Sequence, residues 1–239
     1  MDEWPAGEWP GELRRNPPRS SPTFLLRAPL SAWLREEALR AGERYGSYRV
    51  LDVGCGVKPY YPFFQDAASE YVGVDVVENP AADLHGSVEE LPVPDASFDL
   101  VLCTQVLEHT VDPQQAVREL RRVLAPGGRV LASTHGVEVY HPSPEDNWRW
   151  THTGLERLFR TSEWTNVTVT PVGGTSACLG KLTATYVDLL ARRLHVGFLG
   201  GLGVRLINRL APSVDRHVAL LREPRPGTLF VNYHVVADA

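Results

Sequence analysis

Residues 48–56 read Tyr48-Arg49-Val50-Leu51-Asp52-Val53-Gly54-Cys55-Gly56, an apolar run that stops at an acid and enters a Gly-x-Gly turn. An α/β sheet uses such a strand and turn to bring its backbone close to a nucleotide-like ligand. A side chain at either glycine would forbid the turn or hold the ligand away. Pro59 occupies the position of the third glycine of the dinucleotide fingerprint G-x-G-x-x-G. The sequence therefore disfavours a pyrophosphate site.

Strand and helix signals alternate along the chain. Apolar runs predict strands at residues 48–53, 71–76, 82–84, 98–103, 129–134, 166–172 and 229–236. Helices are expected over 29–45, after the cap Asp112 with Pro113 in first position, and after the capping-box pair Thr153 and Glu156. This alternation is typical of a doubly wound parallel sheet.

A long segment, residues 173–227, separates the last two predicted strands. Apolar residues at helical spacing predict two amphipathic helices within about 175–225. Eight Lys and Arg against three Asp and Glu give 175–225 a charge of +5, so the rest of the chain carries −10. Two interpretations stay open. In the first, the insert packs against protein, either as a cover of the substrate pocket or as a homodimer interface. In the second, it rests on an anionic membrane or a lipid-linked substrate.

Length, charge and cysteine content set broad bounds. A chain of 239 residues can hold one large α/β domain, and we expect an N-terminal arm or lid over 1–28 and the domain over 29–239. The net charge of −5 gives no reason to expect nucleic acid as a partner. Cys55, Cys103 and Cys178 match neither zinc nor disulfide spacing. With no signal peptide and no membrane-spanning run, we expect a cytoplasmic protein.

Several segments together resemble a known enzyme family. The D-x-G-x-G form of residues 52–56 resembles motif I of class I S-adenosylmethionine (SAM)-dependent methyltransferases. Residues 83–102 and 103–109 resemble the corresponding blocks of small-molecule members, methyltransferase type 11-like. The resemblance spans about 45–172 and 228–237. It implies a Rossmann-like seven-stranded fold of order 3-2-1-4-5-7-6, here with a helical insert between strands six and seven, and SAM as cofactor.

The resemblance also assigns a cofactor site. Asp75, at the end of the second strand and 19 positions after Gly56, is placed to bind the ribose hydroxyls. Ser87 stands where relatives often carry an Asp that bonds the adenine amino group. Here the adenine would be bound by the Ser87 hydroxyl, the Val88 amide or Glu89. The backbone near Gln105 would flank the sulfonium. The expected cofactor residues are Asp52, Gly54, Cys55, Gly56, Tyr60, Asp75, Val76, Ser87, Val88, Gln105 and Val106.

Three histidines are candidates for a catalytic base. His109 follows the fourth strand, and His135 and His141 follow the fifth, at the edge where open α/β sheets bind substrates. Imidazole titrates near neutral pH and can deprotonate an acceptor hydroxyl. Each histidine could equally be a loop residue that bonds backbone. No two of His135, His141, Asp146 and His152 sit at a recognised ligand spacing, so no metal is expected.

Residues 145–151, Glu-Asp-Asn-Trp-Arg-Trp-Thr, resemble the D-x-W-R-[WYF]-T element of methyltransferases associated with glycan, cell-envelope or natural-product pathways. Tryptophan faces stack on sugar rings, and a guanidinium forks onto a carboxylate or phosphate. Asp146, Trp148, Arg149 and Trp150 are therefore candidate substrate residues. The alternative is structural, with Arg149 tying Asp146 while the tryptophans pack over the sheet.

The sequence as a whole predicts SAM-dependent methyl transfer to a hydroxyl of a small molecule or a sugar or glycan intermediate, with S-adenosylhomocysteine (SAH) as product. The alternatives are a non-catalytic SAM-binding protein of regulatory role and a methyltransferase of nitrogen or carbon acceptors in natural products. An NAD-dependent oxidoreductase is disfavoured by Pro59 and by the lack of a Tyr-x-x-x-Lys motif. The acceptor itself is not identified.

Overall fold

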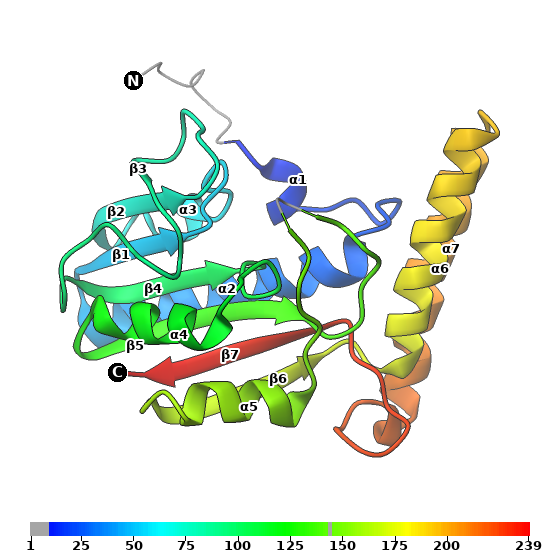
Figure 1. The fold of residues 1–239 in the computed structure, drawn as a ribbon. Helices are drawn as coiled ribbons and strands as arrows, with labels where there is room; N and C mark the ends of the chain where they lie inside the picture. The colour runs from blue at the N-terminus through cyan, green and yellow to red at the C-terminus, as the bar shows by residue number, and fades with distance from the viewer. Residues whose placement is uncertain (1–9, 143–144) are drawn as a thin grey trace.

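A computed structural model describes residues 10–142 and 145–239, and it contains one seven-stranded sheet of order β3-β2-β1-β4-β5-β7-β6 (Figure 1). Strands β1 to β5 run parallel, whereas β7 is antiparallel to both β5 and β6. This confirms the predicted strand order. The strands are β1 (Tyr48–Val53), β2 (Ala68–Asp75), β3 (Leu84–His85), β4 (Phe98–Thr104), β5 (Leu124–His135), β6 (Thr165–Val172) and β7 (Asn232–Asp238).

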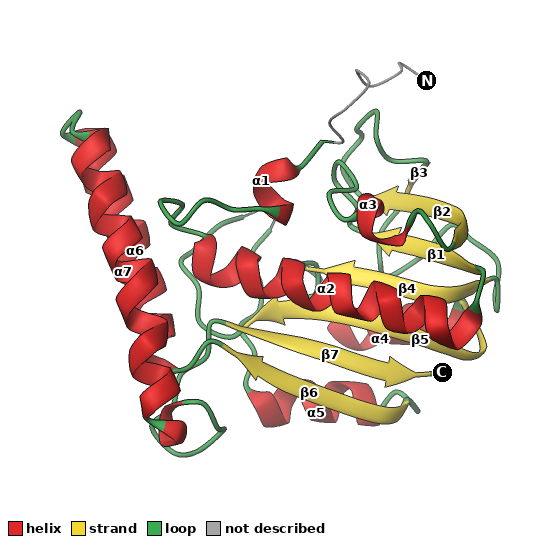
Figure 2. Cartoon of the chain, turned by 180° about the vertical axis from the view of Figure 1, so that it is seen from behind, coloured by secondary structure: helices red, strands yellow, loops and turns green. Residues whose placement is uncertain are grey.

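Helices cover both faces of the sheet (Figure 2). α2 (Phe24–Tyr45) and α3 (Tyr61–Phe64) lie on one face, and α4 (Pro113–Arg122) and α5 (His152–Arg160) lie on the other. Because side chains alternate along a strand, β4 feeds both layers. Leu100 and Leu102 pack in the core under α2, whereas Val101 and Cys103 pack in the core under α4 and α5.

Several element ends depart from the expected ones: β2 begins at Ala68, β3 covers Leu84–His85, and β7 covers Asn232–Asp238. α5 is capped by Thr151, whose hydroxyl accepts a hydrogen bond from the Gly154 amide at 3.1 Å, so the predicted capping box at Thr153 was wrong. β5 begins at Leu124 with an irregular register, so residues 125–128 belong to the strand. α2 begins at Phe24, and Pro29 lies inside it.

The N-terminal segment is partly described. Residues 1–9 of the predicted arm lie outside the described residues, whereas 10–23 include the short helix α1 (Glu12–Arg15). The buried Arg15 guanidinium donates to the carbonyl oxygens of Pro10 and Pro59, at 2.8 and 2.6 Å. These contacts hold the segment against the turn that follows β1.

The predicted insert is a helical hairpin of α6 (Thr175–Arg193) and α7 (Gly197–His217), followed by a short 3-10 helix, Ala219–Leu221. A Cβ on Gly200 would lie 2.2 Å from that of Ala191, and one on Gly180 would lie 2.5 Å from that of Ala211. Glycine therefore permits the close approach of the two helices. Figures 1 and 2 show the hairpin rising beside the sheet, with its tip standing clear. Among the described residues, no helix is long and apolar enough to cross a membrane.

The base of the hairpin is fixed by buried polar contacts. The Asp215 carboxylate of α7 accepts hydrogen bonds from the backbone amides of Ser176 and Ala177, at 2.9 and 2.8 Å, and so caps the start of α6. The Asn208 side-chain amide donates to the carbonyl oxygens of Arg19 and Ser21, both at 2.8 Å. The hairpin is thus closed at its base by Asp215 and attached to the body about halfway along α7 by Asn208.

Candidate functional site

A cavity of about 620 Å³ opens at the carboxyl ends of the parallel strands. Its walls come from the turn after β1, the end of β2, the segments after β3, β4 and β5, the start of α2, and α6. Open α/β sheets bind ligands at this edge. Thr23 and Leu26 near the N-terminus and Lys181 and Thr185 of α6 complete the lining, so the insert forms part of the wall.

The glycine turn is shaped by close packing and by one carboxylate. Gly54 and Gly56 have φ values of +67° and +51°, and a Cβ on Gly54 would lie 2.3 Å from Val106 Cγ2. Asp75 Oδ2 accepts a hydrogen bond from the Gly56 amide at 2.7 Å, and Oδ1 accepts one from the Val77 amide at 2.9 Å. The carboxylate expected to bind ribose therefore also fixes the turn.

Two of the expected cofactor residues do not line the cavity. Asp52 is buried beneath it, where its Oδ2 accepts a hydrogen bond from the Tyr71 hydroxyl at 2.7 Å and burial raises its pKa to about 7. Cys55 is also buried, with its sulfur turned toward Gly73, and burial raises its pKa to about 12. The cavity does bring together Gly54, Gly56, Tyr60, Asp75, Val76, Ser87, Val88, Gln105 and Val106.

The segment expected to hold adenine is ordered by its own hydrogen bonds. The Ser87 hydroxyl accepts from the Glu89 amide at 3.2 Å. Glu89 Oε1 accepts from the backbone amides of Val111 and Asp112, at 2.7 and 3.0 Å, ahead of α4. The Glu89 carboxylate thus joins this segment to the loop after β4.

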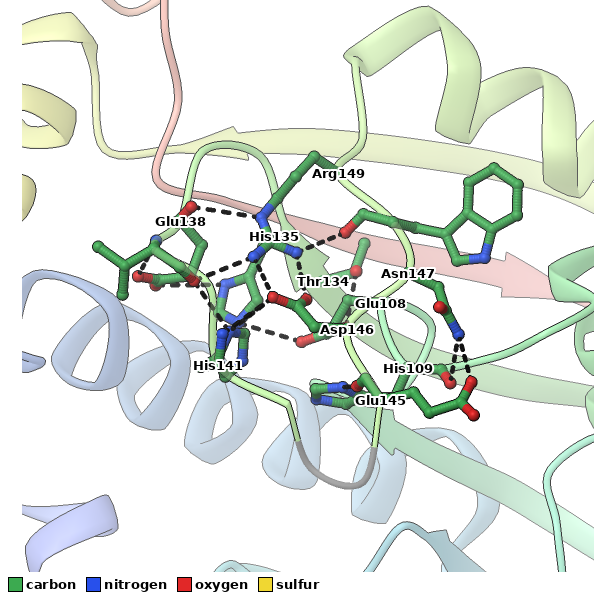
Figure 3. A network of polar contacts seen from close by, with 12 residues as sticks. Glu108, His109, Thr134, His135, Glu138, His141, Glu145, Asp146, Asn147 and Arg149 are labelled. Atoms are coloured by element: carbon green, nitrogen blue, oxygen red, sulfur yellow. Dashed lines mark hydrogen bonds and ion pairs between the residues drawn. The ribbon is translucent and has the colours of Figure 1, made fainter.

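The three predicted histidines meet in the same cavity (Figure 3). The rings of His109 and His141 lie 5.3 Å apart, and those of His135 and His141 lie 4.9 Å apart. Burial lowers the pKa of His135 to about 2 and also lowers that of His109. His109 Nδ1 contacts the carbonyl oxygen of Glu145, which can only accept. Nδ1 therefore carries the proton, and Nε2 keeps a lone pair.

Sequence reasoning missed three charged residues around this cluster. Glu108 is fully buried; its Oε2 accepts from the Thr134 hydroxyl at 2.8 Å, and burial raises its pKa to about 7. The Lys181 ammonium of α6 pairs with the Glu138 carboxylate, and both side chains are buried. Burial lowers the pKa of Lys181 to about 8. Lys181 could have been noticed as the one charged residue between Thr175 and Val187 of α6, but only the fold identifies its partner.

The tryptophan element lies largely outside the cavity. Trp148 and Trp150 stack with ring centroids 5.7 Å apart and border a separate hollow beside α5. The Trp148 indole donates to the Thr110 carbonyl oxygen at 2.8 Å. Arg149 pairs bidentately with Asp146, at 2.5 and 2.7 Å, and this hydrogen-bonded pairing lowers the pKa of Asp146. These contacts match the structural alternative for this element.

The Asp146–Arg149 pair also supports the histidine cluster. Asp146 Oδ2 accepts a hydrogen bond from the His141 backbone amide at 2.9 Å. Arg149 donates to the carbonyl oxygen of Val139, after β5, at 3.0 Å. The Trp148 amide donates to the carbonyl oxygen of Glu108, after β4, also at 3.0 Å. The element therefore fixes the loop that carries His141.

Comparison with known proteins identifies the part of the chain that matches a protein family. Residues 51–132 match the model of the methyltransferase domain family. A protein of Mycolicibacterium smegmatis, named as a probable S-adenosylmethionine-dependent methyltransferase, is 37% identical over 123 residues, which are 46% of this chain and 48% of that one. A ubiquinone biosynthesis O-methyltransferase of Bordetella avium is 36% identical over 117 residues, 43% of this chain and 47% of that one.

A solved structure shares the fold over more of the chain. A SAM-dependent methyltransferase from Archaeoglobus fulgidus superposes with a TM-score of 0.51 at 17% identity, covering 86% of this chain and 94% of that one. This chain spans about half the length of the curated relatives it matches. The family match and the strand order confirm the resemblance to class I SAM-dependent methyltransferases.

Proposed function

We propose that the protein transfers the methyl group of SAM to a hydroxyl oxygen of a small-molecule or glycan acceptor. One observation carries the proposal: the glycine turn with its Asp75 carboxylate and three histidines share a single cavity. The names of the two relatives support SAM as donor and, in one case, oxygen as acceptor. The insert adds Lys181 and Thr185 to the wall, so acceptor preference depends partly on α6.

Methyl transfer is an in-line displacement, so most of the catalysis comes from positioning the acceptor oxygen behind the methyl carbon. The base must remove the hydroxyl proton as the new bond forms. His109 suits this role best, because Glu145 fixes the tautomer that leaves Nε2 as acceptor. His135 suits it least, because its pKa of about 2 makes it a weak base.

The test is binding followed by turnover. Calorimetry should show one SAH per chain, and incubation with SAM and pooled bacterial metabolites should release SAH and yield a methylated product detectable by mass spectrometry. Exchange of His109 for Gln should lower turnover at least about 100-fold while SAH affinity stays within a factor of three. SAH binding without turnover on any acceptor supports the non-catalytic alternative. Full turnover in the His109→Gln variant refutes this histidine as the base.

We further propose that the tip of the α6–α7 hairpin contacts an anionic lipid surface. Phe198 is 79% exposed, Leu194 67% and Leu199 63%, and Arg192 and Arg193 stand exposed beside them. Exposed apolar side chains flanked by arginines are typical of segments that lie in a membrane interface. The exposed apolar residues of α6, α7 and their turn are Leu179, Tyr186, Leu189, Leu190, Leu194, Val196, Phe198, Leu199, Leu202, Leu206, Leu210 and Val214.

Cosedimentation with vesicles of phosphatidylglycerol and phosphatidylcholine tests this contact. Binding should rise with the anionic fraction and fall at least about tenfold in the double variant Phe198→Ser/Leu199→Ser. Leu39→Ser is the matched control, because Leu39 is equally exposed but lies on α2. Equal binding of both variants refutes the contact. A dimer in solution that the double variant abolishes, without vesicle binding, replaces the lipid by a second copy of the chain.

A further inference from the structure

We infer that Glu108, His135 and His141 form a three-ligand site for a divalent transition metal, Zn²⁺ in the first instance, at the wall of the cavity. Each offers one ligand atom, and the three atoms lie within 4.8 Å of one another. Two imidazoles and a carboxylate, with a fourth position open toward a cavity, are the ligand set of many catalytic zinc sites. The inference goes beyond the proposed methyl transfer and does not require it.

The carboxylate of Glu108 points to a missing partner. Its Oε1 lies 3.1 Å from His135 Nε2, yet within the described chain it has no hydrogen-bond partner, although Glu108 is fully buried. An unsatisfied buried carboxylate oxygen is costly. Two ligands on one zinc ion with bonds of about 2.0–2.1 Å stand about 3.3 Å apart in tetrahedral geometry. The observed separation of Oε1 and Nε2 is close to that value.

Groups behind the ligands are arranged to orient them. His141 Nδ1 lies 3.1 Å from the Val139 carbonyl oxygen, which can only accept, so Nδ1 carries the proton and Nε2 is left for a metal. Metal-binding histidines commonly direct their second nitrogen to a carbonyl or carboxylate in this way. His135 Nδ1 lies 3.7 Å from Glu138 Oε2, which is beyond hydrogen-bond distance, and has no hydrogen-bond partner among the described residues. Thr134 holds the other oxygen of Glu108.

The other carboxylates near the site are already paired with cationic side chains. Around the three candidate ligands, the Asp146 carboxylate is paired with Arg149 and that of Glu138 with Lys181. Glu108 has no Lys or Arg within ion-pair distance in the described part of the chain. A nitrogen-rich ligand set prefers Zn²⁺ to Mg²⁺ or Ca²⁺. The sequence predicted no metal because no two of His135, His141, Asp146 and His152 sit at a recognised ligand spacing; Glu108, 27 positions before His135, was not among the candidates.

The site would bear on the proposed reaction in one way. A bound Zn²⁺ lowers the pKa of an oxygen that it contacts, and so would ready an acceptor hydroxyl for deprotonation by His109. This consequence rests on the proposed function, whereas metal binding itself does not.

The experiment measures metal binding directly, on the untagged full chain dialysed against chelator. Titration with Zn²⁺ should show one site per chain with a dissociation constant of about 1 μM or tighter, and Co²⁺ should give the visible absorption of a four-coordinate site. Glu108→Gln and His141→Ala should each weaken Zn²⁺ binding at least about tenfold. His109→Ala is the matched control, since it removes a neighbouring imidazole outside the ligand set. Circular dichroism and SAH affinity verify that each variant is folded.

The outcomes separate the two proposals. Absence of stoichiometric Zn²⁺ binding in the folded wild-type chain overturns the metal site and leaves methyl transfer standing. Binding that survives both ligand substitutions, or that His109→Ala weakens as much as they do, also overturns it. Zn²⁺ binding with the expected variant pattern but no affinity for SAM or SAH supports the metal site and contradicts the proposed function.

Discussion

Exchange of Asp75 for Asn tests whether one carboxylate both builds the glycine turn and holds the cofactor. In the native chain its two oxygens accept hydrogen bonds from the amides of Gly56 and Val77. Asparagine has the same shape but offers one oxygen and one NH₂ group. One of the two amides would therefore face a donor instead of an acceptor.

The size of the effect follows from those contacts. A hydrogen bond to a charged group contributes about 1.5–3 kcal/mol, and Asp75 is only partly buried. We expect unfolding free energy to fall by about 1–2 kcal/mol, which for a chain of this size lowers Tm by about 2–8 °C. The ribose hydroxyls lose a charged acceptor as well, so SAH affinity should fall about 10- to 100-fold.

Asp83→Asn provides a matched control. Asp83 Oδ2 accepts from the Gly73 amide at 2.6 Å and pairs with Lys58, but Asp83 does not line the cavity. Both variants should lower Tm in thermal unfolding, and only Asp75→Asn should weaken SAH in calorimetry. The reasoning is refuted if Asp75→Asn binds SAH with native affinity, or if Asp83→Asn loses affinity to the same degree.

Three further predictions follow from buried contacts. Lys181→Met leaves the buried Glu138 carboxylate without its cation and should lower the free energy of unfolding in urea by about 3–5 kcal/mol. The double variant Lys181→Met/Glu138→Gln should recover most of this loss. A loss under about 1 kcal/mol in the single variant would show that the two side chains do not form a buried ion pair. Gly54→Ala should abolish SAH binding because the added Cβ meets Val106. Gly127 also has a positive φ, +79°, but nothing lies within 4 Å of an added Cβ. Gly127→Ala should therefore lower only the free energy of unfolding, by about 1–2 kcal/mol. The pKa of Asp52 is raised to about 7 in the folded state, so folded Asp52 keeps its proton at pH values where the unfolded chain has already released it. The contribution of this proton to the free energy of unfolding is therefore present at low pH and is lost as the pH rises toward 7. The stability difference between wild type and Asp52→Asn should therefore fall by up to about 1.4 kcal/mol per pH unit between about pH 4 and 7, and a flat difference would count against a protonated Asp52.

The sequence predicted local features well, because strand periodicity, glycine turns and helix caps are encoded within a few residues. The run 48–56 and the cap Asp112 lie where predicted, with the Asp112 side chain accepting from the Gln115 amide. Thr151 and Thr153 both carry a hydroxyl that could cap α5, and in the structure Thr151 is the cap. Strand order could be inferred only through resemblance to a family.

Contacts between distant residues account for what the sequence could not predict. Glu108 meets His135 through neighbouring strands, and Lys181 meets Glu138 across an insert that the family resemblance does not cover. No pattern within either segment indicates its partner. For Trp148 and Trp150 the sequence left a substrate role and a structural role open, and the hydrogen bond from the Trp148 indole to the Thr110 carbonyl oxygen fits the structural one.

The hairpin enters and leaves the sheet at one place, since Gly174 precedes α6 and the Leu229 amide donates to the Thr175 hydroxyl at 3.0 Å, just ahead of β7. No strand pairing includes a residue of the hairpin, and no hydrogen bond between described residues joins the hairpin to the glycine turn. The hairpin is therefore inserted into the fold as one unit, and it supplies one wall of the cavity beside the glycine turn. Exchange of the hairpin at these two junctions would change that wall and keep the residues of the glycine turn as they are.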